Sequence, residues 1–343
     1  MKKHLCTILL GTLFLLGCKQ SNKKESQIME RQSSDFSVEI LDREALNLID
    51  PKAGIQIVAS GFEWTEGPLW IKEGGYLLFS DIPNNRVLKL DSNNKVSVYL
   101  EQSGLTGNNP KGKEPGSNGL LLDSNDHLVL AQHGDRRIAR MEAPLDHPAP
   151  NFSTIVDNYE GKKLNSPNDA VYDKAGNLYF TDPMYGLPKG MDDPTKELNF
   201  QGVYCHLKTG VTILLDTLTR PNGIALSPDE QKLYVAVSDE KHAVWYQYNL
   251  VAPGEVNGKQ LFYDVTNLIG IEGQQGLPDG MKINNNGYVF ASGPGGLWIF
   301  NPEAKAIARI HTGRLTSNCA FSGDEKKLFL TADQDVLRVD LKE

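Results

Sequence analysis

Short runs in which apolar and polar residues alternate occur along most of the chain, and this pattern predicts β-strands. Residues 86–90, Arg-Val-Leu-Lys-Leu, and residues 336–340, Val-Leu-Arg-Val-Asp, are two such runs. A strand with one buried face has this period of two, whereas a helix repeats its apolar positions every three or four residues. No segment shows a long helical period, so the sequence predicts an all-β protein.

The strand runs belong to a longer repeated unit. Each copy starts with a polar lead residue and continues into an apolar strand, a turn rich in Gly, Asn, Asp or Pro, and a second strand. The first apolar residue of that second strand lies 10 or 11 residues after the lead in every copy. The lead residues, separated by 52, 50, 54, 57 and 39 positions, are Glu66, Asn118, Asn168, Asn222, Asp279 and Asn318.

Six units of this size predict a six-bladed β-propeller over residues 50–343. Each unit would form one blade, and closure of the ring would hide most sheet edges. We expect residues 55–58 to help close the ring with the last blade. Unrelated strands in a sandwich would not explain the constant offset within each copy.

The first 17 residues have the pattern of a bacterial signal peptide. Lys2 and Lys3 precede an apolar run, residues 5–16, that is too short to span a bilayer. The run leads into Gly17 and Cys18, which is similar to a lipobox and predicts lipidation of Cys18. An ordinary secretory signal with an incidental Cys is the alternative. Residues 18–49 are then a polar tether, and we expect an exported lipoprotein that faces the periplasm or the cell surface.

Charge and cysteine content narrow the partners. The formal net charge is −8, and it becomes −10 when residues 1–17 are removed. Such an acidic chain is a poor ligand for nucleic acid. Beyond Cys18 only Cys205 and Cys319 remain, too few for a disulfide scaffold. We expect a monomer whose membrane contact is limited to the N-terminal lipid.

The lead residues predict a cation site. In a propeller, the residue before each innermost strand lies at the mouth of the central channel, so six equivalent positions converge there. Every lead residue carries a carboxylate or carboxamide oxygen, which favours a hard cation such as Ca²⁺, with Mg²⁺ or Mn²⁺ as alternatives. The competing interpretation is that Asn and Asp only form turns, but it does not account for Glu66, which is a poor turn former.

At these motifs the sequence resembles the gluconolactonase and senescence-marker-protein (regucalcin) family. The resemblance spans about residues 50–343 and includes motifs that resemble bacterial gluconolactonases, at residues 132–137 and 182–187. The motifs that carry it are residues 66–70, 79–86, 166–169, 181–183, 220–223 and 277–280.

The resemblance implies a divalent cation, Ca²⁺ or else Mg²⁺, Mn²⁺ or Zn²⁺, at the channel mouth. It implies Glu66, Asn222 and Asp279 as ligands, and Asn168 as a ligand or a substrate contact. It also implies that Asp279 is the general base and that the reaction is hydrolysis of a carboxylic ester in a sugar lactone. Asn118 is a further candidate substrate contact.

Three more features near the predicted mouth have two interpretations each. His133 follows a strand and could act as an acid or a substrate donor, or could pair with Asp135 for structural reasons. Arg136 could hold a sugar hydroxyl or carboxylate, or could form a structural ion pair. Residues 183–201 could cover the site as a lid or could be a plain loop between strands.

Two other functions fit the same pattern. A propeller with a structural cation could bind a protein or a glycan without catalysis. A hydrolase of another bond, such as a phosphotriester or a modified glycoside, would use the same oxygen ligands.

Overall fold

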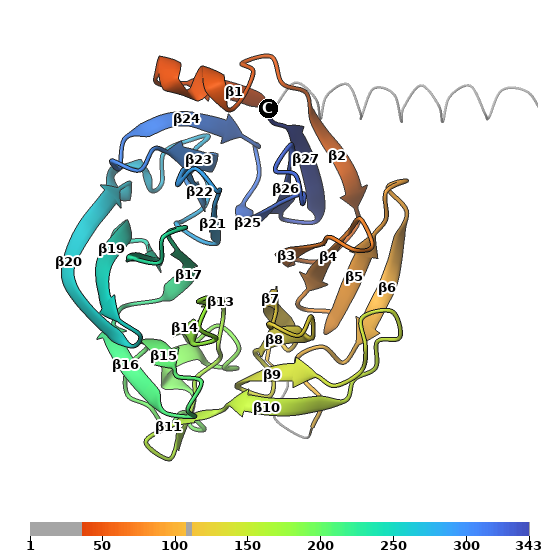
Figure 1. The fold of residues 1–343 in the computed structure, drawn as a ribbon, viewed down its shortest axis with the longest axis vertical. Coiled ribbons are helices and arrows are strands. Elements are labelled where there is room, and N and C mark those ends of the chain that lie inside the picture. Colours follow the sequence, from red (N-terminus) through yellow and green to blue (C-terminus); the bar gives the residue numbers. More distant parts are fainter. Residues whose placement is uncertain (1–35, 108–111, 343) are drawn as a thin grey trace, which may run out of the picture.

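The predicted six-bladed β-propeller is confirmed. The computed structural model describes residues 36–107 and 112–342, in which the inner strands β3, β7, β13, β17, β21 and β25 surround a central channel (Figure 1). Each blade is an antiparallel sheet whose strands follow one another outwards. No helix among the described residues is both long and apolar enough to cross a membrane.

The first three blades follow the simple order of a meander. Blade 1 contains β3 (Thr65–Ile71), β4 (Tyr76–Asp81), β5 (Arg86–Leu90) and β6 (Val96–Glu101). Blade 2 contains β7 (Ser117–Leu122), β8 (Leu128–Gln132), β9 (Arg137–Met141) and β10 (Phe152–Val156). Blade 3 contains β13 (Ala170–Tyr172), β14 (Leu178–Asp182), β15 (Gly202–His206) and β16 (Thr212–Thr217), after a small hairpin of β11 (Asn158–Tyr159) and β12 (Lys162–Lys163).

Blade 4 is also a simple meander, whereas blades 5 and 6 each take a strand from the N-terminal part of the described chain. Blade 4 contains β17 (Pro221–Leu226), β18 (Lys232–Asp239), β19 (His242–Ala252) and β20 (Glu255–Asp264). Blade 5 contains β21 (Met281–Ile283), β22 (Val289–Gly293), β23 (Gly296–Phe300), β24 (Ala306–His311) and β1 (Ser37–Ile40). Blade 6 contains β25 (Thr316–Phe321), β26 (Lys327–Ala332), β27 (Asp335–Asp340) and β2 (Ile55–Ser60). The described part of the chain also contains three short 3-10 helices, η1 (Arg43–Asn47), η2 (Gly190–Asp192) and η3 (Thr266–Leu268).

Ring closure follows the expectation for residues 55–58, because β2 pairs with β27 over Ile55–Ser60. The tether boundary at residue 50 needs correction. Strand β1 pairs with β24, and η1 places the buried side chain of Ala45 against blades 5 and 6. The folded body therefore includes residues 36–49. The predicted signal peptide and Cys18 lie outside the described residues.

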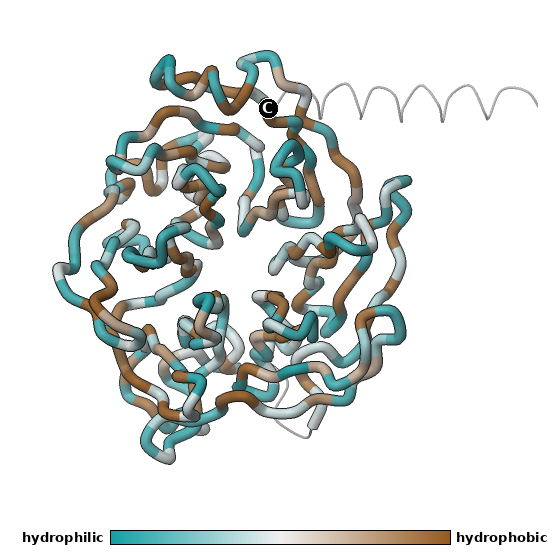
Figure 2. Tube along the Cα trace, in the orientation of Figure 1, coloured by the Kyte–Doolittle hydropathy of each residue, from teal (hydrophilic) through white to brown (hydrophobic). Residues whose placement is uncertain are grey.

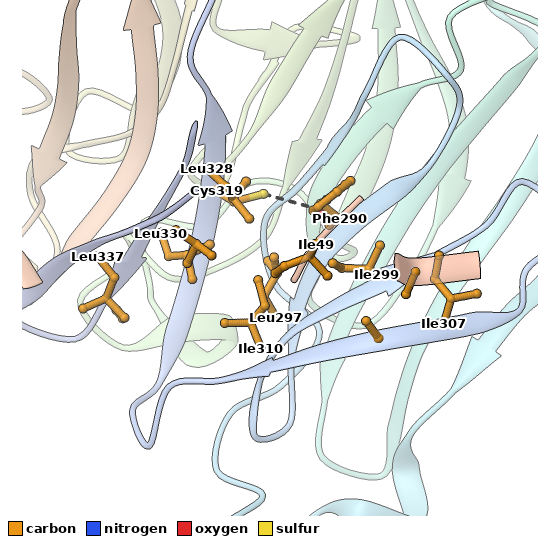
Figure 3. Close-up of a cluster of buried hydrophobic side chains, with 14 residues drawn as sticks. Ile49, Phe290, Leu297, Ile299, Ile307, Ile310, Cys319, Leu328, Leu330 and Leu337 are labelled. Carbon is orange, nitrogen blue, oxygen red and sulfur yellow. Dashed lines mark hydrogen bonds between the residues drawn. The ribbon is translucent and has the colours of Figure 1, made fainter. Parts of the chain in front are cut away.

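The core is divided among the blade interfaces. Apolar residues are spread along the strands of every blade (Figure 2), and the described chain buries one hydrophobic cluster between each pair of neighbouring blades. Figure 3 shows the cluster between blades 5 and 6, where Ile49 from the N-terminal segment joins Phe290 and Cys319. Cys205 and Cys319 are both buried and unpaired. This distributed packing holds the inner strands in fixed positions around the channel.

Candidate functional site

A cavity of about 810 Å³ opens at the mouth of the central channel. Five of the six lead residues line it: Glu66, Asn118, Asn168, Asn222 and Asp279. They come from five different blades, so the structure brings together positions that are more than 200 residues apart in sequence. The expected convergence at the channel mouth is therefore observed for these five.

Local irregularities turn the lead side chains toward the axis. The pairing of the two inner strands shifts register directly after Glu66 in blade 1 and around Asn222 in blade 4, where Pro221 and Ile224 flank the irregularity. Bulges of this kind change which way a side chain points. The interpretation that these residues only form turns does not hold for Glu66 and Asn222, because both lie within strands.

Glycines after the lead residues allow the inner strands to approach closely. A Cβ on Gly67 would lie 2.0 Å from the backbone oxygen of Asn118, and a Cβ on Gly223 would lie 2.3 Å from that of Asp279. Neither position can carry a larger residue without moving the next blade. The glycines thus fix the distance between neighbouring lead residues.

Three oxygens at the mouth have no hydrogen-bond partner within the described chain. They are Oδ1 of Asn118, Oδ1 of Asn222 and Oδ1 of Asp279, and all three are shielded from solvent. Buried polar atoms are almost always paired, so a set of three from three blades requires an explanation. Asn222 donates its amide to Oγ of Ser238 at 3.1 Å, which leaves its oxygen directed away from that partner.

These residues fit a hard divalent cation. Two carboxylates and up to three amide oxygens match the oxygen ligands that Ca²⁺ and similar ions prefer. Among residues 36–107 and 112–342, no group of three or more His, Cys, Asp and Glu side chains could hold a metal. Any ion at this mouth would therefore depend on the amides as well as on Glu66 and Asp279.

The electrostatics of the mouth also favour a bound cation. Burial raises the pKa of Asp279 well above its usual value, and repulsion from Glu66 and Asp169 raises it further. Burial also raises the pKa of Glu66 to about 7, although the Gly67 N–H donates to its Oε2 at 2.6 Å. A negative charge on either carboxylate is therefore disfavoured in this buried site unless a partner is present, and a bound cation would be such a partner.

Asn318, the sixth lead residue, has a different role. Its Oδ1 accepts the N–H of Cys319 at 2.8 Å, and its amide nitrogen donates to Oε2 of Glu66 at 3.2 Å. A Cβ on Gly280 would overlap its side chain, so Asn318 lies beneath that glycine and outside the cavity lining. It therefore supports Glu66 instead of presenting an oxygen to the mouth.

His133 is buried behind the cavity wall. Its Nδ1 lies 3.5 Å from Oε2 of Glu114, and Glu114 itself lines the cavity. Asp135, the alternative partner, instead contacts Thr106 and Arg137. His133 can thus reach a substrate only through Glu114, a residue that the sequence motifs did not single out.

Arg136 does not line the mouth, which corrects the expectation of a substrate contact. Its guanidinium donates to the backbone oxygens of Leu164 at 2.7 Å and Thr195 at 2.9 Å. These bonds fasten the segment before β13 and the loop between β14 and β15 to blade 2. Asp182 does not line the cavity either, and its carboxylate accepts the backbone N–H groups of Asn165 and Ser166.

Residues 183–201 form a packed wall of the site. Leu187 and Leu198 are buried, and Tyr185 lines the cavity. Trp64 and residues 269–277 also line it. The signal that could have identified Trp64 is its place two residues before Glu66.

The fold and the site define a propeller with an acidic, oxygen-rich cavity at one end of its channel. The chain matches the family model described as the SMP-30/Gluconolactonase/LRE-like region over residues 64–334. It therefore belongs to the SMP-30/gluconolactonase/LRE-like family.

Known relatives agree with this assignment. A gluconolactonase from Zymomonas mobilis is 39% identical over 300 residues, 86% of this chain and 83% of that protein. The solved structure of a gluconolactonase from Xanthomonas campestris superposes with a TM-score of 0.75 at 27% identity, covering 89% of this chain and 95% of that one. A calcium-binding protein, regucalcin, from Agrobacterium tumefaciens shares the fold with a TM-score of 0.64 at 17% identity, covering 83% and 94%. The resemblance drawn from the motifs is confirmed, and so is the assignment to a class of lactone-hydrolysing enzymes.

Proposed function

We propose that this protein opens the ring ester of sugar lactones with the help of one divalent cation, foremost Ca²⁺, at the channel mouth. The observation that carries the proposal is the set of three unpaired buried oxygens beside Glu66 in the cavity. Family membership supports the reaction, since relatives of this chain are named gluconolactonases. The ligands we assign are Glu66, Asn222 and Asp279, with Asn168 at or beside the ion.

The side chains divide the chemistry among them. When bound, the cation would stabilise the negative charge that develops on the lactone carbonyl oxygen. Asp279 takes a proton from the water whose oxygen attacks the carbonyl carbon. The bond from that carbon to the ring oxygen then breaks, the proton passes to the ring oxygen, and a hydroxy acid results. Asn118 and Asn168 orient the sugar through its hydroxyl groups.

A panel of aldonolactones tests the proposal. The protein is stripped with a chelator, resupplied with Ca²⁺, Mg²⁺, Mn²⁺ or Zn²⁺ singly, and assayed for acid release. We expect hydrolysis to disappear on chelation and to return with at least one of these ions. Hydrolysis that persists unchanged after complete chelation would contradict the metal dependence.

The same experiment separates the rival functions. A protein that binds Ca²⁺ but hydrolyses neither lactones nor chromogenic esters would be a binding module. One that hydrolyses phosphotriesters but no lactone would have the site we describe with another substrate.

We also propose that the protein is exported and anchored through a lipid on Cys18. The apolar run before Gly17 and Cys18 supports this proposal. We expect Cys18→Ser to release the protein from the membrane fraction. Unchanged processing and membrane attachment of this variant would show that Cys18 is not the anchor.

A further inference from the structure

The cavity has an apolar lip on one side. Trp64 and Leu315 line it together with Ile269, Ile271 and Leu277. The side chains of Ile271 and Leu315 are 52% and 38% exposed, so together with their apolar neighbours they present a contiguous apolar surface to a ligand. This side of the cavity takes no part in the cation site.

The lip is continuous because it comes from three neighbouring blades. The N–H of Thr65, next to Trp64, donates to the backbone oxygen of Asp333, whose own N–H donates to Leu315, each at 2.9 Å. Residues 269–277 lead into blade 5 and are held there, since the N–H of Gly295 donates to the oxygen of Gln275 at 2.9 Å. The connections into the inner strands of blades 5, 6 and 1 thus line one side of the mouth.

Charge restricts what the cavity can accept. Five acidic residues occur among its described lining residues, and Lys, Arg and His are absent from that lining. The five are Glu66, Glu114, Glu240, Glu272 and Asp279. A divalent cation would balance two of these charges and leave the rest near the rim. A phosphorylated or otherwise anionic lactone would be repelled.

Size gives a third restriction. The cavity holds about 810 Å³. Pockets of ~300–1,000 Å³ enclose drug-sized ligands, whereas a six-carbon lactone has only about twelve heavy atoms. A monosaccharide lactone at the cation site would therefore leave the lip uncovered.

We infer that the substrate is an uncharged lactone that carries a second sugar ring, and that this ring lies on the lip. A sugar ring has an apolar C–H face, which Trp64 and Ile271 can cover, and hydroxyl edges. Gln274, Gln275 and Glu240 line the same cavity and can hydrogen-bond those edges, whereas an alkyl chain would leave them unpaired. This inference rests on the proposed lactone hydrolysis and specifies its substrate class.

A comparison of four lactones tests the inference. They are a six-carbon aldonolactone, the lactone of a neutral β-linked disaccharide, a phosphorylated six-carbon lactone, and a lactone with a straight alkyl chain. We expect kcat/KM for the disaccharide lactone to exceed that for the six-carbon lactone about tenfold, the scale of one added apolar contact. The phosphorylated lactone should be at least about tenfold poorer than its neutral parent.

Variants of the lip locate the effect. Ile271→Ser and Leu315→Ser should remove most of the disaccharide preference, measured as the ratio of kcat/KM for the disaccharide lactone to that for the six-carbon lactone. Val211→Ser is the matched control, because Val211 is 54% exposed in the connection between β15 and β16 and does not line the cavity. As a readout besides activity, the neutral disaccharide should change the tryptophan fluorescence of the wild type but not of Trp64→Phe.

The outcomes separate the two proposals. If no lactone is hydrolysed, the proposed function itself fails. If the six-carbon lactone is hydrolysed and the disaccharide lactone gains nothing, or the lip variants keep the preference, the second-ring inference is wrong. A faster reaction with the alkyl lactone than with the disaccharide lactone, or equal rates for the phosphorylated and neutral lactones, also overturns it.

Discussion

Replacing Asp279 with Asn separates the two roles that we propose for this carboxylate. The two side chains have nearly the same size, and the carboxamide keeps an oxygen that can bind a cation. It cannot accept a proton from water, and it removes one negative charge from the cavity. The variant therefore changes metal binding and proton transfer by different amounts.

The structure sets the size of each change. In the metal-free protein Asp279 lies near Glu66 and Asp169, its Oδ1 is buried without a partner, and burial raises its pKa well above the usual value. Asn carries no charge for burial and Glu66 to disfavour, so the substitution should stabilise the metal-free protein by about 1–3 kcal/mol. Each 1 kcal/mol raises Tm by roughly 1.5–2 °C in a folded body of about 300 residues. Loss of the general base should lower kcat by about 10²–10⁴.

Thermal unfolding and lactone hydrolysis measure the two effects. Tm is determined in chelator and across a Ca²⁺ titration, and turnover is followed by acid release at saturating metal. We expect Asp279→Asn to have a higher Tm in chelator, a smaller gain with Ca²⁺, and a turnover that extra metal does not restore. Asn222→Ala is the control, because weaker metal binding should be its main defect and saturation should recover much of its rate.

Two results would refute this reasoning separately. Near wild-type turnover of Asp279→Asn at saturating metal would show that the residue is a ligand only, and Glu114 backed by His133 would become the candidate base. A lower Tm in chelator together with an unchanged gain from Ca²⁺ would place Asp279 outside the cation site.

Three further predictions follow from the site and its surroundings. Glu66→Gln should weaken Ca²⁺ binding, measured by calorimetry, more than Asn222→Ala does, because it leaves the ion's charge less balanced; wild-type affinity in Glu66→Gln would contradict this assignment. Gly223→Ala should lower the free energy of unfolding, measured by urea titration, by about 1–3 kcal/mol, since its Cβ would lie 2.3 Å from the backbone oxygen of Asp279. Gly54→Ala is the control, and it should be neutral because a Cβ there meets nothing within 4 Å. Burial raises the pKa of Asp182 from 3.8 to about 7, so the folded protein keeps a proton that the unfolded chain releases between these values. The protonated Asp182 side chain therefore contributes up to about 4 kcal/mol to the free energy of unfolding below pH 4, and this contribution should decline as the pH rises to 7. Asp182→Asn should abolish this decline when the free energy of unfolding is measured by urea titration at each pH. An equal decline in both proteins would argue against this prediction.

The repeat in the sequence was enough to predict the blades and the mouth. Lead residues such as Glu66, Asn222 and Asp279 could be located because each precedes or begins an inner strand at a constant offset. Closure by residues 55–58 was expected because a propeller closes its ring, and the pairing of β2 with β27 confirms it. These features depend on local patterning, which one sequence records directly.

Other features depend on contacts that have no local pattern. The use of Ser37–Ile40 as an extra strand on blade 5 is set by an open edge more than 260 residues away. Asn318 matches the other lead residues in sequence but turns its amide toward Glu66, because it lies beneath Gly280. Arg136 lies in a motif that suggested a substrate contact, yet its guanidinium donates a hydrogen bond to the backbone oxygen of Thr195. Only tertiary packing distinguishes such cases.

The pairing of β2 with β27 also has a consequence for folding kinetics. Ile55 faces Val339, so the final blade joins positions at nearly opposite ends of the chain. Loop closure over this span costs about 5 kcal/mol of chain entropy, whereas each inner hairpin closes a turn of a few residues. We therefore expect the single blades to form early and ring closure to be a late, slow step that requires the complete C-terminus. Until then β27 is an open edge with apolar neighbours, and this stage is the one at which the chain is most exposed to aggregation.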